Sequence, residues 1–242
     1  TPLSKGMIPG FVERNHIDLS AYTRQKFYSY NDFFTRRLKE GERPVSSDPQ
    51  VLISPCDGKV TVSRIDRNSH FLIKDTPYTL ERLLGSQALA RRYMGGYAVI
   101  LRLTVDDYHH YCYVADGMKS RARKIPGVFH TVNPAANEVY PIYHENTREY
   151  CLLKTEQFGT ITMMEVGAMM VGKITNLEEN PCEVKRGKEK GYFEFGGSTI
   201  VLLLQHGKVR IDEDLLDNTE NGYETIVRMG ERIGKCKLPK RA

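Results

Sequence analysis

The stretch that decides the fold runs from Gly191 to Leu204 and reads Gly-Tyr-Phe-Glu-Phe-Gly-Gly-Ser-Thr-Ile-Val-Leu-Leu-Leu. It opens with an aromatic run, Tyr192–Phe195, and closes with an apolar, partly β-branched run, Ile200–Leu204, typical of a fully buried strand. The polar break between them, Gly196–Thr199, is ordinary turn chemistry on spacing alone. Two glycines before a serine also leave the preceding peptide carbonyl open to attack by a neighbouring hydroxyl.

Short strand-like runs recur on both sides of this stretch and are separated by turn residues. They are Val51–Ile53, Lys59–Val62, Phe71–Ile73, Tyr97–Val105, Gly127–His130, Tyr150–Leu153, Gly159–Val166 and Met169–Ile174. The tail, Glu224–Gly234, predicts a strand, a turn and a second strand. One helix, Thr79–Met94, is expected among the strands because it is rich in Leu, Ala and Arg.

The N-terminal part has a different pattern. Phe11–Lys39 is helical in spacing, with a cap at Asp18 and a second cap at Asn31 or Asp32. The second helix is predicted to carry apolar residues on one side and basic residues on the other: Phe33, Phe34 and Leu38 against Arg36, Arg37 and Lys39. Such a helix could lie on a membrane surface, although packing on its own domain is the favoured interpretation.

A linker rich in Pro and Ser, Gly41–Gln50, separates the two patterns. The sequence therefore predicts a helical, membrane-facing or packing arm over residues 1–45 and a β-rich catalytic domain over residues 46–242. The expected fold class is α+β, with the helical N-terminal arm on a mostly antiparallel β domain.

Bulk composition is that of a globular protein: 242 residues, 40% hydrophobic and 27% charged. The net charge of +5 is a mild excess that does not predict a nucleic-acid binder, and it suits an anionic substrate or membrane surface. No apolar run approaches the roughly 20 residues of a spanning helix. The five cysteines are widely spaced, which predicts neither a zinc site nor a disulfide framework and favours a reducing cytoplasm.

Four residues are candidates for chemistry. Ser198, Asp57 and a histidine would supply a nucleophile, an orienting carboxylate and a base. His109 and His110 follow a predicted strand, and alternation would turn one toward a site and the other toward solvent. Each of these residues taken alone is commonly structural. The sequence has no metal-ligand spacing, and it lacks the Gly-x-Ser-x-Gly motif that would indicate an α/β-hydrolase.

Six stretches taken together, in order, resemble the phosphatidylserine decarboxylase family. They are Tyr30–Lys39 running on to Arg43-Pro44, Ser54–Val60, Asp107–His109, Phe129–Pro134, Asn146–Glu149 and Phe195–Thr199. The resemblance covers most of the chain, from about Asp18 to Gly234. Its Gly-Gly-Ser-Thr form is similar to the shorter bacterial, clostridial-type branch.

The resemblance implies a self-processing proenzyme. The hydroxyl of Ser198 would attack the carbonyl of Gly197, and elimination of the resulting ester would give a large chain, 1–197, and a small chain, 198–242. Position 198 would then carry a covalent pyruvoyl group. Its ketone would form a Schiff base with the substrate amine and withdraw electrons as CO2 leaves.

The family roles transfer to individual positions with one exception. Asp57 matches the orienting aspartate, and His109 matches the first of two family histidines three residues apart, the one linked to decarboxylation and substrate protonation. The second family histidine falls on Cys112. The base that activates Ser198 is therefore open among His109, then His110, then Cys112, whose thiol is the weakest candidate.

The tail segment Val227–Gly234, paired with Asp57–Val60, also resembles the hairpins of biotinyl- and lipoyl-carrier domains. This likeness predicts a barrel-sandwich of interlocked hairpins. It is read as architecture only, because Met229 has no modifiable lysine beside it.

The predicted function is conversion of phosphatidylserine to phosphatidylethanolamine and CO2 at the cytoplasmic face of the cell membrane, as a peripheral protein. One alternative keeps the chemistry but uses a soluble amino acid or another serine phospholipid. The other is a β-sandwich binding module that has lost processing. Expected partners are the phospholipid, the membrane surface and the two chains of one precursor; a homodimer stays open, and no nucleic acid is expected.

Overall fold

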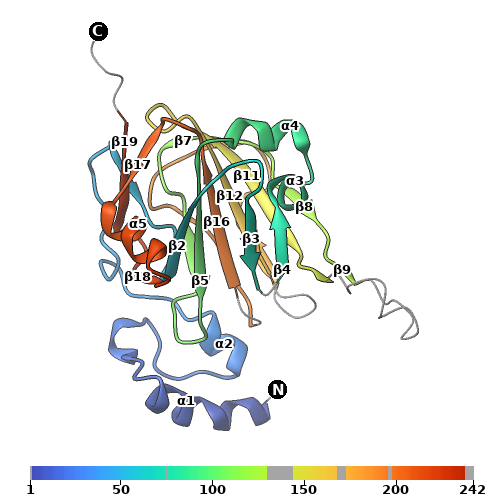
Figure 1. The fold of residues 1–242 in the computed structure, drawn as a ribbon. Coiled ribbons are helices and arrows are strands. Elements are labelled where there is room, and N and C mark those ends of the chain that lie inside the picture. The colour runs from blue at the N-terminus through green and yellow to red at the C-terminus, as the bar shows by residue number, and fades with distance from the viewer. Residues whose placement is uncertain (1, 75, 130–143, 168–172, 196–197, 238–242) are drawn as a thin grey trace, which may run out of the picture.

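A computed structural model describes residues 2–74, 76–129, 144–167, 173–195 and 198–237. Figure 1 shows a β-rich body with the helical N-terminal arm packed against one end of it. The few short helices and mostly antiparallel sheets confirm the predicted α+β class. Within the described ranges no sheet closes into a barrel.

The largest sheet has the strand order β14-β7-β11-β12-β16-β5-β2-β18, with β8 also paired to β11. Its strands are β14 (Cys182–Val184), β7 (Gly117–Lys119), β11 (Arg148–Lys154), β12 (Thr160–Val166), β16 (Ser198–Leu204), β5 (Tyr97–Leu103), β2 (Gly58–Arg64), β18 (Thr225–Val227) and β8 (Arg123–Ile125). All seven residues of β16 are buried, which explains the uninterrupted apolar run in the sequence. The strand predicted at Ile200 begins two residues earlier, at Ser198.

The two faces of β16 contact different cores. Ile200, Leu202 and Leu204 belong to the main core, whereas Val201 and Leu203 belong to a second one. Because side chains alternate along a strand, Ser198 lies on the side of the main core and Thr199 on the side of the second. This alternation decides which groups can reach the serine.

The main core is closed by a second sheet of the order β13-β15-β6. Its strands are β13 (Ile174–Asn176), β15 (Glu189–Phe193) and β6 (His110–Cys112). Buried Tyr111, Ile174 and Phe193 from this sheet join Ile200 and Leu202 in one cluster. The segment that leads into Ser198 therefore leaves one sheet at Phe193 and enters the other at Ser198.

The second core lies under the hairpin of β3 (His70–Ile73) and β4 (Thr76–Thr79) and under short helices α3 (Leu80–Leu84), α4 (Gln87–Ala90) and η3 (Arg91–Tyr93). The single helix predicted over Thr79–Met94 is wrong in its continuity. Gly85 ends α3 in the left-handed conformation, with φ 59°, and Ser86 caps α4. The predicted start is confirmed, because the Thr79 hydroxyl accepts the Arg82 backbone N–H.

The predicted interlocked hairpins are present. β1 (Val51–Ile53) pairs with β19 (Arg232–Cys236), and the following strand β2 pairs with β18 from the same tail. β17 (Val209–Ile211) adds to β19, and α5 (Glu213–Glu220) packs beside β2. The strand, turn and strand predicted for the tail are therefore confirmed.

The arm consists of η1 (Pro2–Met7), α1 (Ile8–Arg14), η2 (Leu19–Ala21) and α2 (Tyr30–Phe34). It has a small core of its own made by Ile8, Phe27 and Phe33. The predicted long second helix is wrong: α2 ends at Phe34, and Ser29 rather than Asn31 or Asp32 caps it. Arg36 is 3% exposed and so does not belong to the predicted basic face, whereas Arg37 and Lys39 are exposed; the packing interpretation is confirmed for Phe33 and Phe34.

The remaining described strands, β9 (Val128–Phe129) and β10 (His144–Glu145), form a short antiparallel pair. The motif residues His130–Pro134 and most of the strand predicted over Met169–Ile174 lie outside the described residues. No described helix combines the length and the apolar character needed to cross a bilayer.

Candidate active site

Ser198 is the first residue of β16 and lies opposite Leu103 of β5. It is 3% exposed, and its Oγ is buried with no hydrogen-bond partner among the described residues. Buried hydroxyls are normally paired, so an unpaired one in the centre of a sheet marks a position kept for something other than stability. Gly196 and Gly197, the other half of the predicted cleavage site, lie outside the described residues.

His109 lies just before β6, after a tight turn in which the Thr104 backbone N–H donates to Asp107 Oδ2 over 2.6 Å. Its Nδ1 is 2.9 Å from the Asp107 carbonyl oxygen, so Nδ1 carries the proton and Nε2 is left as an acceptor. Nε2 is buried and has no partner in the described part of the chain. Burial, and to a smaller extent the nearby Arg36, lower the pKa of His109 from 6.5 to about 3.

Two contacts bring His109 and the serine segment together. The Phe193 backbone N–H donates to the His109 carbonyl over 3.0 Å. The ring of Phe34 lies 3.8 Å from the His109 ring and 5.5 Å from the ring of Phe195, three residues before Ser198. Phe34 therefore contacts both His109 and Phe195, the last described residue before Ser198.

His110 points elsewhere, but it does not face solvent as one of the two histidines was predicted to do, because it is only 2% exposed. Its Nδ1 lies 2.7 Å from Glu189 Oε1 and its Nε2 3.1 Å from the Thr35 carbonyl oxygen. The ring is stacked between Tyr108 and Tyr192. Both ring nitrogens of His110 are therefore occupied, so of the two neighbouring histidines only His109 has a nitrogen without a partner among the described residues.

The contacts of His110 also change the pKa of Glu189. Burial opposes its ionisation, but hydrogen bonds from His110 and Arg37 outweigh burial and lower the pKa of Glu189 from 4.5 to about 2. This cluster fastens α2 and the residues after it to β15. It acts on the arm rather than on the serine.

Cys112, at the position of the family's second histidine, is 1% exposed. Burial raises the pKa of its thiol from 9.0 to about 12. The sulfur has only a long contact of 4.0 Å to the Ser54 carbonyl oxygen. A thiol in this setting stays protonated at neutral pH and is unsuited to taking a proton from Ser198.

Asp57 has a different set of partners from the predicted one. Its carboxylate accepts two hydrogen bonds from the Arg43 guanidinium and one from the Met229 backbone N–H, which is 2.8 Å from Oδ1. Among the described contacts of Asp57, none reaches a histidine. The residue joins the linker after the arm to the tail hairpin, and its orienting role stays a prediction.

Sequence reasoning missed the contribution of the arm to this site. Arg36 donates to the carbonyl oxygens of Asp106 and Asp107 at 2.8 and 3.3 Å, which holds the turn before His109. The Phe195 backbone N–H donates to Asn31 Oδ1 over 3.2 Å. The signal in the sequence is that Arg36 and Asn31 both belong to the Tyr30–Lys39 stretch, one of the six stretches that carry the family resemblance.

Two cavities flank the site. One of about 610 Å³ lies on the Thr199 side of β16 and is lined also by Lys74, Arg102 and Glu224. Another of about 420 Å³ lies where the arm meets Asp57 and Arg43. Within the described residues, no group of three His, Cys, Asp or Glu side chains could hold a metal ion.

Comparison with known proteins gives a consistent result. The family model described as phosphatidylserine decarboxylase matches residues 30–235. "Phosphatidylserine decarboxylase proenzyme 2" of Clostridium acetobutylicum is 45% identical over 94% of this chain and 78% of its own length. The "phosphatidylserine decarboxylase proenzyme" of Fusobacterium nucleatum is 42% identical over 98% and 80%, and that of Clostridium tetani 41% over 96% and 80%.

Proposed function

The chain belongs to the phosphatidylserine decarboxylase family, and from this premise we propose that it is a self-processing carboxy-lyase that converts phosphatidylserine to phosphatidylethanolamine and CO2. The observation that carries the proposal is that Ser198 Oγ and His109 Nε2 are both buried and have no hydrogen-bond partner in the described part of the chain. An unpaired serine hydroxyl is available for attack on the preceding carbonyl, and an unpaired imidazole nitrogen is available to move the substrate's protons.

Position 198 fits a pyruvoyl group formed by cleavage. Ser198 begins a strand, so a cut before it leaves the pairing of Thr199–Leu204 with β5 and β12 intact. The small chain would also keep β17, β18 and β19 in their sheets. The pyruvoyl ketone, when present, supplies the electron withdrawal that decarboxylation needs.

His109 is proposed to handle the substrate's protons. A serine headgroup carries an ammonium that must lose a proton before its nitrogen can react, and the carbon that loses CO2 must later gain one. A neutral imidazole with a free Nε2 can accept the first proton and return it to the carbon. The Asp107 carbonyl keeps Nδ1 protonated during both transfers.

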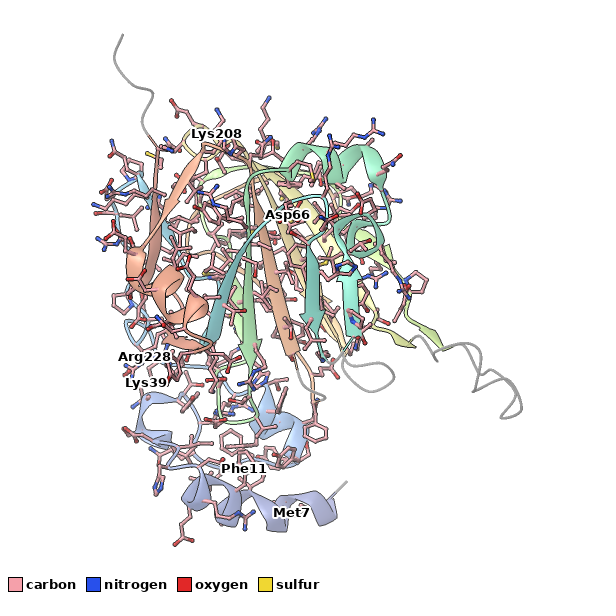
Figure 2. The ribbon with its side chains drawn as sticks, viewed as in Figure 1. Met7, Phe11, Lys39, Asp66, Lys208 and Arg228 are labelled. Atoms are coloured by element: carbon pink, nitrogen blue, oxygen red, sulfur yellow. The ribbon has the colours of Figure 1, made fainter. Side chains whose placement is uncertain are left out.

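A membrane surface is the proposed place of action. Tyr28 and Met7 of the arm and Phe195 beside the site are 80%, 65% and 43% exposed. Figure 2 shows Met7 at the outer side of the arm and Phe11 on the side toward the body. The arm and the residues after it also expose six cations: Lys5, Arg14, Arg24, Lys26, Arg37 and Lys39. Exposed apolar and basic side chains together suit binding to anionic lipid. The homodimer stays a prediction.

The alternatives are separated by simple assays. Activity on free amino acids but not on dispersed phosphatidylserine would favour a soluble substrate, and activity on a different serine lipid would change the substrate alone. A purified chain that stays intact and carries no carbonyl would favour the binding module, which Cys112 keeps open.

Replacement of Ser198 tests the proposal directly. Intact-mass analysis of wild type is expected to give two chains, 1–197 and 198–242, with the smaller one blocked to N-terminal sequencing. Ser198→Ala is expected to give one uncut, inactive chain, because no hydroxyl remains to attack. Ser46→Ala, in the linker, is the matched control and should be cut normally. A fully active Ser198→Ala protein would end the proposal.

A further inference from the structure

A charged cluster lies between the two sheets of the main core. Lys190 Nζ of β15 is 2.7 Å from Glu165 Oε2 of β12 and 2.6 Å from Asn176 Oδ1 of β13. The Asn176 amide in turn donates to Glu165 Oε2 over 3.2 Å. The side chains of Lys190 and Glu165 are 3% and 0% exposed, so this ion pair is removed from water.

Stability does not account for this pair. Desolvating two charges costs about as much as their attraction returns, and apolar replacements of such pairs are often neutral or stabilising. One oxygen is also unused: Glu165 Oε1 is buried with no hydrogen-bond partner among the described residues. An acceptor left free inside a core calls for a donor that the resting protein does not show.

The register places that donor nearby. Glu165 lies directly opposite Ile200 in the pairing of β12 with β16. Opposite residues share a face of the sheet, and Ile200 and Ser198 share theirs, so the carboxylate is on the same side as the Ser198 hydroxyl. The two residues are diagonal neighbours, whose separation of roughly 7–8 Å a long side chain can bridge.

A β-bulge turns the amine of Lys190 toward Glu165. The pairing of β15 with β6 shifts its register between Glu189 and Gly191, so Lys190 is the extra residue. Bulges redirect a side chain at the cost of a regular ladder and occur often beside active sites. Here the bulge coincides with a lysine whose side chain is turned into the core against Glu165.

We propose that Glu165, held by Lys190 and Asn176, is the base that activates Ser198 for self-cleavage and takes the place of the histidine that Cys112 replaces. The inference rests on the proposed function. The Ser198 hydroxyl proton passes to Glu165 Oε1 as the bond from Oγ to the preceding carbonyl carbon forms. The same proton then passes to the Ser198 nitrogen as the carbon–nitrogen bond breaks, which leaves an ester, a free amine and an ionised Glu165.

The proton affinities of the two free acceptors agree with this assignment. Burial raises the pKa of Glu165 above 4.5, whereas burial lowers that of His109 to about 3. In the uncut precursor, where no anionic substrate is bound to offset it, a proton on His109 would create an imidazolium near the buried Arg36, whereas a proton on Glu165 removes a buried charge. Lys190 keeps the carboxylate ionised until it is needed, because its positive charge counteracts the effect of burial.

The test is a time course of cleavage. Wild type, Glu165→Gln and the double variant Glu165→Gln/Lys190→Met are made by a short pulse of cell-free translation and followed by intact mass. The expected result is a cleavage rate at least about 100-fold lower in both variants, the usual effect of removing a general base. The double variant leaves no unpaired buried charge, so it keeps the test valid if the single variant misfolds.

The matched control is Glu178→Gln, which removes a carboxylate paired with the exposed Lys188 outside the cluster. It should be cut at the wild-type rate. A folded double variant that is cut at the wild-type rate would overturn the role of Glu165 while leaving the proposed function intact. A wild-type chain that never cleaves would instead overturn the proposed function, so the two failures are distinguishable.

Discussion

The three residues that the sequence grouped as a triad occupy two regions. In one the buried polar atoms are hydrogen-bonded, and in the other several of them have no partner in the described part of the chain. Around Asp57 both carboxylate oxygens are engaged, by Arg43 and by the Met229 backbone. Ser198 Oγ, His109 Nε2 and Glu165 Oε1 are instead among the buried polar atoms that the described residues leave unpaired. Paired buried groups help to hold a fold together, whereas an unpaired acceptor or hydroxyl requires an explanation, which here is the proposed chemistry.

Both regions depend on the arm, though in different ways. Arg43 ties the end of the arm to the interlocked hairpins through Asp57. Arg36 and Phe34 instead hold the His109 turn and cover its ring. Loss of the first contact should loosen the fold, whereas loss of the second should disturb the reaction. Substitutions in the two regions can therefore be compared by the free energy of unfolding and by the rate of the reaction.

The largest effect is expected at His109. His109→Asn keeps a donor for the Asp107 carbonyl but removes Nε2, so decarboxylation by the cleaved enzyme should fall by about 10²- to 10⁴-fold. Self-cleavage should continue, because its proton acceptor is assigned to Glu165. Turnover of dispersed phosphatidylserine and intact mass, measured on the same sample, check both halves. Loss of cleavage together with turnover would return the activating role to His109.

A smaller effect on stability is expected at the other region. Asp57→Asn and Arg43→Met each break one partly buried bidentate ion pair, so each should lower the free energy of unfolding by about 3 kcal/mol. Urea unfolding of both variants and of the double variant checks this, and the double variant should lose little more than either alone.

Cleavage of the same variants sharpens the comparison. If Asp57 only anchors the arm, the folded fraction of both single variants should be cut at similar rates. A loss of cleavage confined to Asp57→Asn would support the orienting role that the family resemblance implies.

The sequence was sufficient for the parts of the fold set by local pattern. The apolar run after Ser198 and the tail hairpin were predicted because burial and alternation leave a direct trace in residue order. The arm was not, because Arg36 looks like a surface cation until the carbonyls of Asp106 and Asp107, 70 and 71 residues away, become its partners. Nor could Gly85 be recognised as a break without its backbone angle.

The site shows the same limit. Ser198 and His109 were found by resemblance, but the sequence did not reveal that Phe34 contacts both His109 and Phe195. Glu165 gave no signal, because a single acidic residue in a strand reads as a solvent-facing position. Its significance comes from the register with Ile200 and from the bulge at Lys190, and both are properties of strand pairing.

The smallest expected effect, measured for each pH unit, is the dependence of the free energy of unfolding on pH. The pKa of His109 is lowered from 6.5 to about 3 by burial and by Arg36 and His110, with Asp106 opposing them. Below about pH 6.5 the unfolded chain therefore binds a proton that the folded chain refuses, and each further pH unit costs the fold about 1.4 kcal/mol until the folded pKa is reached. In His109→Asn this contribution is absent, whereas the carboxylates titrate as in wild type. Urea midpoints measured from pH 7 to pH 4.5 should show wild type losing up to roughly 3 kcal/mol more than the variant. If the urea midpoints of wild type and His109→Asn fell in parallel with pH, His109 would take up a proton in the folded chain as readily as in the unfolded one. His109 would then no longer count as an unpaired neutral base, and the contrast with the Asp57 region would lose that residue.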